Sequence, residues 1–301
     1  MLRRTVLLVV LLVAVLAASS SASGGRHATT PLFPLTVKTA NGSVTIAKRP
    51  TRIVSLSPTA TESLFAVGAG AQVIAVDDQS DYPKQAPKTA LSGYRPNLEA
   101  IASYNPDLVI VSNDGGVVAG LQKLGVTVLV EPAANTVAEA YDEIRQIGQA
   151  TGNAKPATTV VRGMQSTLTK LIRSVPKKAR HLKVFHELSP DYYSATSSTF
   201  IGRIYRLFGF TNIADAADTT HSGYPKLSAE YIVAANPDIV VLADSVCCSQ
   251  TAGAVAGRPG WQQVNAVRRN RVIPVDDSIA SRWGPRIVDF ARVIAQVAKR
   301  S

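Results

Sequence analysis

An internal repeat constrains the fold of this chain more than any other feature of its sequence. Residues 93–111 read GYRPNLEAIASYNPDLVIV, and residues 223–242 read GYPKLSAEYIVAANPDIVVL. Each copy has Gly-Tyr, then Glu-x-Ile, then Asn-Pro-Asp before an apolar run, with seven residues from the Glu to the Pro. Because Asn-Pro-Asp ends a helix and turns the chain into a buried strand, the repeat predicts two similar lobes. It places Glu99 and Glu230 on equivalent helices.

Short apolar runs alternate with helical stretches through both copies of the repeat. This alternation predicts an α/β fold in which mostly parallel sheets are covered by helices. In the first helix, Thr59 or Thr61 is expected to be the N-cap, and the helix should run through Val67 and stop at Gly68. The expected strands are residues 53–56, 73–76, 108–111 and 126–130 in the first lobe, and residues within 182–188, 238–242 and 271–275 in the second.

A long helical stretch separates the two sets of strands. Residues 153–176 contain helix formers and a periodic apolar pattern, so they predict one connecting helix of about 20 residues, roughly 30 Å long. A flexible linker would be rich in Gly, Ser and Pro instead. Before the first lobe, Leu35–Ile46 predicts a β-hairpin around the pair Asn41–Gly42. The last helix is expected from about Pro285 to Lys299.

The N-terminal residues resemble a targeting segment. Arg3 and Arg4 precede an uncharged apolar run and a Ser/Ala-rich stretch, which is the order of a secretory signal, with cleavage expected after Ala22. An uncleaved anchor is the alternative, and no cysteine near this run offers a lipid attachment site. The predicted parts are a signal peptide (1–22), a segment with the hairpin (23–50), an N-terminal lobe (51–152), the connecting helix (153–176) and a C-terminal lobe (177–301).

Charge and cysteine content narrow the possible partners. The formal net charge is +11, but Lys and Arg are spread along the chain without a dense basic run, so nucleic acid is not expected as a partner. The two cysteines, Cys247 and Cys248, are adjacent. A strained vicinal disulfide, free thiols and a bond to another chain all remain open, as does the oligomeric state.

These features together resemble the solute-binding proteins of ABC importers for cobalamin and iron–siderophore complexes. The resemblance covers nearly all of residues 50–301 and rests on several stretches taken together. It implies two α/β lobes joined by one long helix, with the ligand between them, and a permease with ATPase subunits as partners. The matching stretches are RIVSLSPTATESLFAVGAG (52–70), SDYPKQA (80–86), NLEAIASYNPDLVIV (97–111), SAEYIVAANPDIVV (228–241) and SRWGPRIVDFA (281–291).

The resemblance also implies roles for the repeated residues. Glu99 and Glu230 match two surface glutamates that meet arginines of the permease, although solvated helix glutamates are the plainer interpretation. Tyr94 and Tyr224 stand where the cobalamin binder has cleft aromatics, and ordinary loop tyrosines are the alternative. The change from Trp to Tyr, and Gln79 in place of a ligand-adjacent Tyr, favour a ligand other than cobalamin itself.

Five further residues are candidates for contact with the ligand. His186, just after the expected strand residues Lys183–Phe185, could ligate iron or cobalt, or it could be a hydrogen-bonded structural histidine. Of Tyr192 and Tyr193, in the loop that follows, at least one is expected to face the cleft. Arg282 and Trp283 could hold an anionic or aromatic ligand group, and local packing is the alternative for Trp283.

Other functional classes fit the sequence less well. A serine hydrolase typically has its nucleophile in a G-x-S-x-G elbow, which is absent, so no catalytic residues are expected. A site for bare zinc or manganese needs converging ligands, but after His27 only His181, His186 and His221 remain, without close ligand spacing. A surface protein without a ligand is the residual alternative. The sequence therefore predicts an exported, non-catalytic binding protein for a metal chelate, with no cofactor or resident metal of its own.

Overall fold

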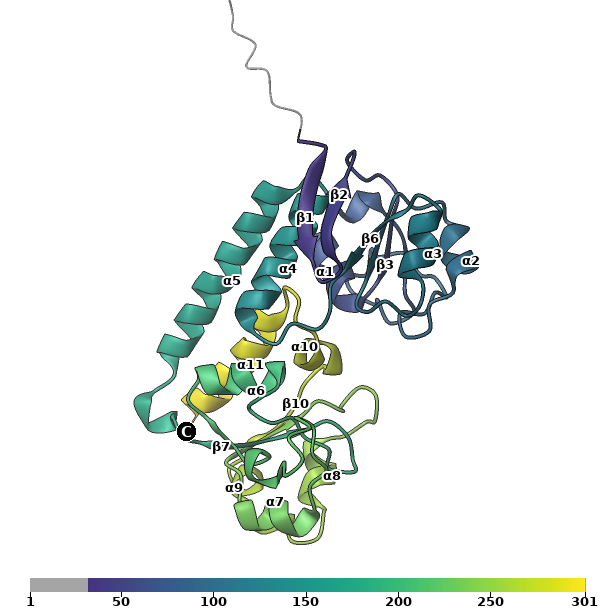
Figure 1. The fold of residues 1–301 in the computed structure, drawn as a ribbon. Coiled ribbons are helices and arrows are strands. Elements are labelled where there is room, and N and C mark those ends of the chain that lie inside the picture. The colour runs from purple at the N-terminus through teal and green to yellow at the C-terminus, as the bar shows by residue number, and fades with distance from the viewer. Residues whose placement is uncertain (1–31, 301) are drawn as a thin grey trace, which may run out of the picture. The chain divides into compact units, whose positions relative to one another are not determined.

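The computed structural model describes residues 32–300, which contain two four-stranded parallel sheets and the helices that cover them (Figure 1). The predicted α/β class, with two lobes and one long connecting helix, is confirmed. The predicted signal peptide, residues 1–22, lies outside the described residues. Within residues 32–300, no helix is both long and apolar enough to cross a membrane.

The N-terminal lobe begins with the predicted hairpin, which pairs Leu35 with Ile46. Its parallel sheet has the order β4-β3-β5-β6. All four residues of β3 and of β5 are buried, as expected for central strands covered on both faces. The strands are β1 (Leu35–Thr39), β2 (Gly42–Ile46), β3 (Ile53–Leu56), β4 (Val73–Val76), β5 (Leu108–Val111) and β6 (Thr127–Val130), and the helices are α1 (Pro58–Ala66), α2 (Leu98–Ala102), α3 (Val118–Lys123) and α4 (Val137–Ala150).

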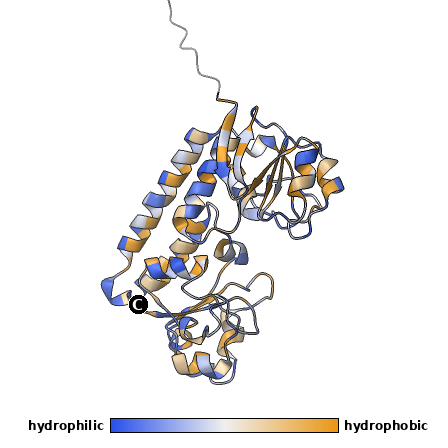
Figure 2. Cartoon of the chain, in the orientation of Figure 1, coloured by the Kyte–Doolittle hydropathy of each residue, from blue (hydrophilic) through white to orange (hydrophobic). Residues whose placement is uncertain are grey.

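The C-terminal lobe repeats this arrangement with the order β8-β7-β9-β10. Figure 2 shows apolar residues concentrated in the sheets, with polar residues on the outward faces of the helices. The strands are β7 (Lys183–Glu187), β8 (Thr211–Asn212), β9 (Ile239–Leu242) and β10 (Val272–Pro274), and the helices are α6 (Phe200–Leu207), α7 (Ala229–Ala235), α8 (Ala252–Ala256), α9 (Asn265–Arg268), α10 (Asp277–Ser281) and α11 (Ile287–Lys299).

The Asn-Pro-Asp turns of the repeat perform the same structural task in both lobes. Asn105 and Asn236 both have a left-handed φ, 46° and 51°; Asn236 is the C-cap of α7, and Asn105 lies in the turn just after α2. The Asp107 carboxylate then accepts the backbone N–H of Arg52 at 3.0 Å. In the second lobe, Asp238 accepts the backbone N–H of Lys183 at 3.1 Å. Each aspartate thus ties the repeated turn to the start of the neighbouring central strand.

The predicted connecting helix is α5 (Ala154–Ser174), which leads from the first lobe to the second. Its buried residues Ala157, Val161, Met164 and Leu168 follow helical spacing and form one apolar stripe. This stripe faces α4 and α11, with which α5 packs. The last helix of the chain therefore returns from the C-terminal lobe to the connector.

The N-cap of α1 differs from the prediction. Ser57, rather than Thr59 or Thr61, caps the helix, and its hydroxyl accepts the N–H of Ala60 at 3.3 Å. Pro58 fills the first helical turn, where a missing N–H costs nothing. Thr61 is fully buried and bonds instead to Ser55, at 2.9 Å, and to Ser80, at 2.8 Å. The last helix begins at Ile287, two residues later than expected.

Candidate functional site

Residues from both lobes line a hollow of about 250 Å³, called here the cleft pocket. The N-terminal lobe contributes the loop after β6, residues 133–135. The C-terminal lobe contributes the start of α6 and the loop at residues 221–224, and Ser281 and Trp283 complete the lining. A larger hollow of about 490 Å³ between the start of α4 and α6 contains none of the predicted ligand residues. A hollow of about 530 Å³ includes Tyr192 and Glu230 in its lining, but the C-terminal lobe alone forms it. The cleft pocket is therefore the candidate site.

Two of the predicted aromatic residues, Tyr224 and Trp283, line the cleft pocket. Tyr224 is half-exposed, and its backbone N–H donates to the Ser222 hydroxyl at 3.1 Å. Trp283 is partly buried against the hydrophobic core, and its Nε1–H donates to Glu143 Oε2 at 2.9 Å. A fixed indole and a half-exposed phenol give the pocket flat faces for a large ligand with aromatic or conjugated parts.

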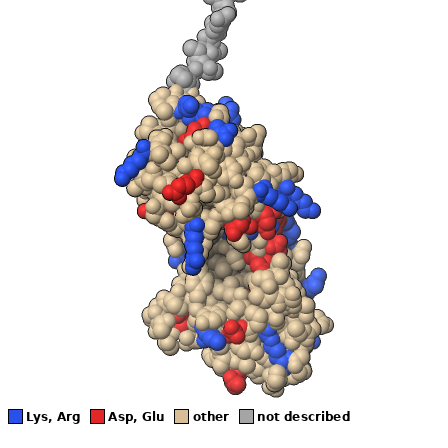
Figure 3. Space-filling model, turned by 90° about the vertical axis from the view of Figure 1, so that its right-hand side faces the viewer, with Lys and Arg blue, Asp and Glu red and all other residues tan. Residues whose placement is uncertain are grey.

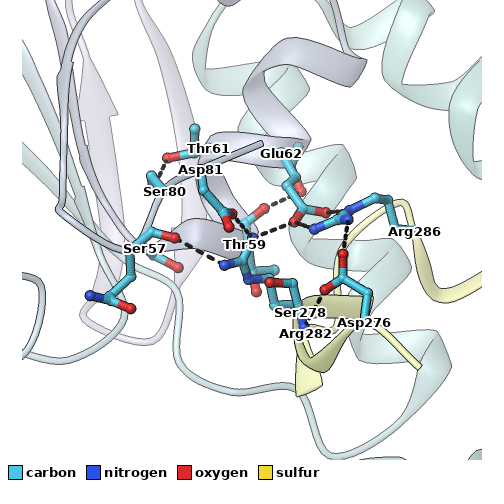
Figure 4. A network of polar contacts seen from close by, with 12 residues as sticks. Ser57, Thr59, Thr61, Glu62, Ser80, Asp81, Asp276, Ser278, Arg282 and Arg286 are labelled. Atoms are coloured by element: carbon cyan, nitrogen blue, oxygen red, sulfur yellow. Dashed lines mark hydrogen bonds and ion pairs between the residues drawn. The ribbon is translucent and has the colours of Figure 1, made fainter. Parts of the chain in front are cut away.

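Arg282, next to Trp283, forms internal ion pairs rather than facing a ligand. Its Nη1 lies 2.9 Å from Glu62 and 2.8 Å from Asp81, and Nη2 donates to the Gln79 carbonyl at 2.9 Å. Figure 4 shows Arg282 and Arg286 both turned toward Glu62 on α1. Neutralising the buried Glu62 occupies that guanidinium in this structure, and the contact between Arg282 and an anionic ligand group stays a prediction.

His186 lies in the core, inside β7, and not after the strand as expected. It has no exposed surface, and its Nδ1 is 2.7 Å from the Tyr205 hydroxyl. Its ring also packs edge-on against Phe290. Burial lowers the pKa of His186 to about 3, so the imidazole is neutral at pH 7. The structure therefore places His186 as the alternative expected from the sequence, a hydrogen-bonded structural histidine, and not on the surface of the cleft pocket.

The other three predicted tyrosines are outside the lining of the cleft pocket. Tyr192 stacks on Trp261 with ring centroids 6.1 Å apart, and the Arg258 guanidinium lies 5.1 Å from its ring. Tyr192 thus packs locally and does not face this pocket. Tyr193 is 44% exposed beside Lys226, and Tyr94 is 84% exposed. A ligand role for Tyr94 and Tyr193 stays a prediction.

The two repeated glutamates occupy equivalent exposed positions. Glu99 lies in the first turn of α2, which Asn97 caps, and Glu230 lies in the first turn of α7, which Ser228 caps. Both side chains are exposed. Hydrogen bonds from the backbone and from Ser228 lower the pKa of Glu230, which keeps it ionised. Figure 3 shows charges of both signs scattered over one face of the molecule.

Two acidic residues behind the cleft pocket were not found from the sequence. Glu131 directly follows β6, and Glu143 on α4 holds the Trp283 indole. Glu131 could have been noticed in the sequence, because it directly follows a buried apolar strand and acidic side chains are almost never buried without a partner. The burial of Glu143 could not be predicted, because α4 has one solvated face and glutamates are common on such a face.

The structure contains no ready site for a bare metal ion. No group of three His, Cys, Asp or Glu side chains in residues 32–300 is placed to hold one. Cys247 and Cys248 are free and exposed, and a hydrogen bond that the Cys247 thiol donates to Cys248 raises the pKa of Cys247 to about 12. The Cys247 thiol is therefore not poised as a thiolate ligand at neutral pH.

Comparisons with known proteins agree on one family. The model of the family described as periplasmic binding protein matches residues 53–279. A Bacillus subtilis protein named as an uncharacterised ABC transporter substrate-binding lipoprotein is 35% identical over 282 residues, covering 89% of this chain and 86% of the relative. A cobalamin-binding protein of Halobacterium salinarum is 32% identical, with 85% of this chain and 72% of the relative covered.

Solved structures show the same fold. A possible iron-binding periplasmic solute-binding protein of Staphylococcus epidermidis has 30% identity and a TM-score of 0.71, covering 83% of this chain and 99% of that one. The vitamin B12 binding protein of Vibrio cholerae has 25% identity and a TM-score of 0.69, covering 83% of this chain and 97% of that one.

Proposed function

Because the chain belongs to the periplasmic binding protein family, we propose that it captures a metal chelate in the cleft pocket and delivers it to an ABC permease. The chelate is a ferric siderophore, haem or cobalamin. The observation that carries this proposal is the pocket itself, which both lobes line and to which Tyr224 and Trp283 contribute aromatic faces. A site of this kind holds a bulky ligand by contact with its faces rather than by coordinating its metal.

An organic chelate fits the structure better than a bare metal ion. The relative from Halobacterium salinarum is named for cobalamin, and the Staphylococcus epidermidis structure is described as possibly iron-binding. Residues 32–300 provide no cluster of ligands for a naked ion, and His186, the histidine in the core, is inaccessible. The metal would therefore arrive already enclosed by its organic ligand.

The proposed transport role divides the work between this chain and its partners. The Bacillus subtilis relative is named as a substrate-binding protein of an ABC transporter, which supports the proposal that this chain binds cargo and that separate subunits hydrolyse ATP. Glu99 and Glu230 are proposed to meet basic residues of the permease, one from each lobe. The long α5 packs against α4 and α11 and resists hinge motion, so only modest closure is proposed on binding.

Export follows from the family, and the mode of attachment is a proposal. The Bacillus subtilis relative is named a lipoprotein, whereas the cysteines of this chain are Cys247 and Cys248, far from its N-terminal apolar run. We therefore retain the prediction of a cleaved signal peptide without a lipid anchor. Mass spectrometry of the mature protein from its host would decide between cleavage, lipidation and retention of the segment.

A fluorescence screen tests the proposed function directly. Trp283 lines the cleft pocket, so haem, cobalamin or a ferric siderophore bound there should quench its emission. A coloured chelate also quenches the buried Trp261 by energy transfer, so a Trp283→Phe variant should lose only part of the quenching and keep the binding. We expect a Kd of micromolar or better, about −8 kcal/mol. Binding of free zinc or manganese, with no chelate in the panel bound, would overturn the proposal.

A further inference from the structure

A second hollow, called here the acidic pocket, adjoins the cleft pocket. Its volume is about 320 Å³, and its lining includes four acids, Glu131, Glu139, Asp142 and Glu143. Lys38 is the one basic residue in that lining. The two pockets share Ala133 and Asn135 in the loop after β6. A ligand in the cleft pocket therefore lies next to an acidic hollow.

Glu131 is the most unusual member of the acidic pocket. It is 4% exposed, and its Oε1 is fully buried without a hydrogen-bond partner among the described residues. A buried carboxyl group without a partner costs free energy, because it loses its bonds to water and gains none in return. No arginine or lysine pairs with Glu131, in contrast to the other buried glutamates, Glu62 and Glu187, which have arginine partners.

Glu143 connects the acidic pocket to the cleft pocket. Its Oε2 accepts the Nε1–H of Trp283, and the Trp283 side chain lines the cleft pocket. Burial raises the pKa of Glu143 to about 8, and burial together with the nearby Glu143 charge raises the pKa of Glu131 to about 8. The two acids lack a cation between them, and a cation placed there would favour their charged forms.

The remaining charged groups around this pocket are already engaged or lie at its edge. Glu139 accepts the backbone N–H of Asn135 at 2.8 Å. Asp142 is paired with Arg145 at 2.6 Å on the exposed side of α4. The Lys38 side chain comes from β1 and has no ion pair among the described residues. Within this lining, the acids without a cationic partner are thus Glu131 and Glu143, the two most deeply buried.

An organic cation fits this pocket better than a metal ion, since no three acids among residues 32–300 are placed to share an ion. We propose that the acidic pocket is a subsite for a positively charged group, a protonated amine or guanidinium, carried by the ligand in the cleft pocket. An ammonium offers three N–H donors, and a guanidinium offers five, for the carboxyl oxygens of Glu131 and Glu143. This inference rests on the proposed function and specifies it: the cargo is a chelate with a cationic arm.

The first test needs no chelate. The carboxyl carbons of Glu131 and Glu143 are followed by NMR from pH 5 to 10, with and without butylammonium chloride, and with butanol as the uncharged control. Butylammonium should lower both apparent pKa values, and its affinity should rise with pH as the two acids lose their protons. Potassium chloride at equal ionic strength controls for screening. Equal titration curves with butylammonium and potassium would overturn the subsite.

The second test uses a matched pair of chelates, a ferric trishydroxamate with a free terminal amine and its N-acetylated analogue. We expect the amine form to bind at least tenfold more tightly, and Glu131→Gln with Glu143→Gln to abolish the difference. Glu143→Gln keeps an oxygen for Trp283, and unchanged circular dichroism would show that the variants fold. The control Asp289→Asn removes a charge that pairs with Arg292 outside the pocket, and should preserve the difference.

The two proposals fail in different ways. Equal affinity for both chelates would overturn the cationic subsite while leaving chelate binding intact. If neither chelate binds, the butylammonium titration still supports or overturns the subsite by itself, and the fluorescence screen decides the proposed function. Lys38→Gln gives a check in the opposite direction: removing the basic residue of the lining should strengthen butylammonium binding.

Discussion

Arg286 and Glu62 form a two-pronged ion pair, with Nε 3.0 Å from Oε2 and Nη2 2.6 Å from Oε1. Arg282 adds a third bond to the same carboxylate at 2.9 Å. The Glu62 side chain is 1% exposed. The pair joins α1 of the N-terminal lobe to the segment just before α11, so it holds the returning C-terminal residues in place beside the cleft pocket.

We expect Glu62→Gln to destabilise the protein by about 3–5 kcal/mol, because it leaves two largely buried guanidinium groups without their counter-charge. Urea unfolding followed by circular dichroism measures this. The matched control is Asp289→Asn, which breaks an exposed i,i+3 pair with Arg292 and should cost about 0–1 kcal/mol. Equal costs for the two variants would contradict the structural role of the Glu62 cluster.

Tyr224→Ala should weaken chelate binding by about 1–3 kcal/mol without loss of stability, as expected for an aromatic anchor that is half-exposed in the pocket. Titration calorimetry measures the affinity. Tyr94→Ala tests whether the ligand extends beyond the pocket, and we expect a smaller loss, about 1 kcal/mol, because this ring is 84% exposed. Unchanged affinity in both variants would place the ligand elsewhere.

Glu99→Arg and Glu230→Arg should impair uptake and leave the affinity for ligand in solution unchanged. Both acids are exposed at equivalent positions on α2 and α7, so each can meet a basic residue of a two-fold permease. The second contact is then effectively intramolecular, and the double variant should lose more than either single one. Transport of radiolabelled ferric chelate in cells with the cognate permease gives the readout. Normal uptake by the double variant would rule out this docking.

Acid should destabilise the protein through His186. Burial lowers its folded-state pKa to about 3, below the ordinary value of 6.5, so the unfolded chain binds the additional proton between these values. The contribution of the neutral ring to the free energy of unfolding is fully present above pH 6.5. It is lost as pH falls toward 3, by up to about 1.4 kcal/mol per pH unit. A double variant, His186→Phe with Tyr205→Phe, removes the titrating group and its partner together. Urea unfolding from pH 4.5 to 7.5 should show a shallower pH dependence in that variant.

The sequence by itself determined the lobes and their connection. Asn105 and Asn236 sit in turns that depend on local backbone preferences and on a proline that follows, so the same short pattern gives the same helix end and the same strand twice. The apolar stripe of α5 follows from periodicity in one continuous segment. The exposure of Glu99 and Glu230 likewise follows from their place in the first turn of short, capped helices.

Only the tertiary structure decided which side chains meet. Arg282 lies 220 positions from Glu62, and Trp283 lies 140 from Glu143, and no local pattern carries information about such pairs. His186 and Trp283 were both plausible ligand residues in the sequence. His186 lies in the core because the packing around β7 leaves no path to its imidazole. Trp283 lines the cleft pocket because the loop before α11 is open on one side. The burial of a side chain depends on all the residues that pack around it, and these residues come together only in the folded chain.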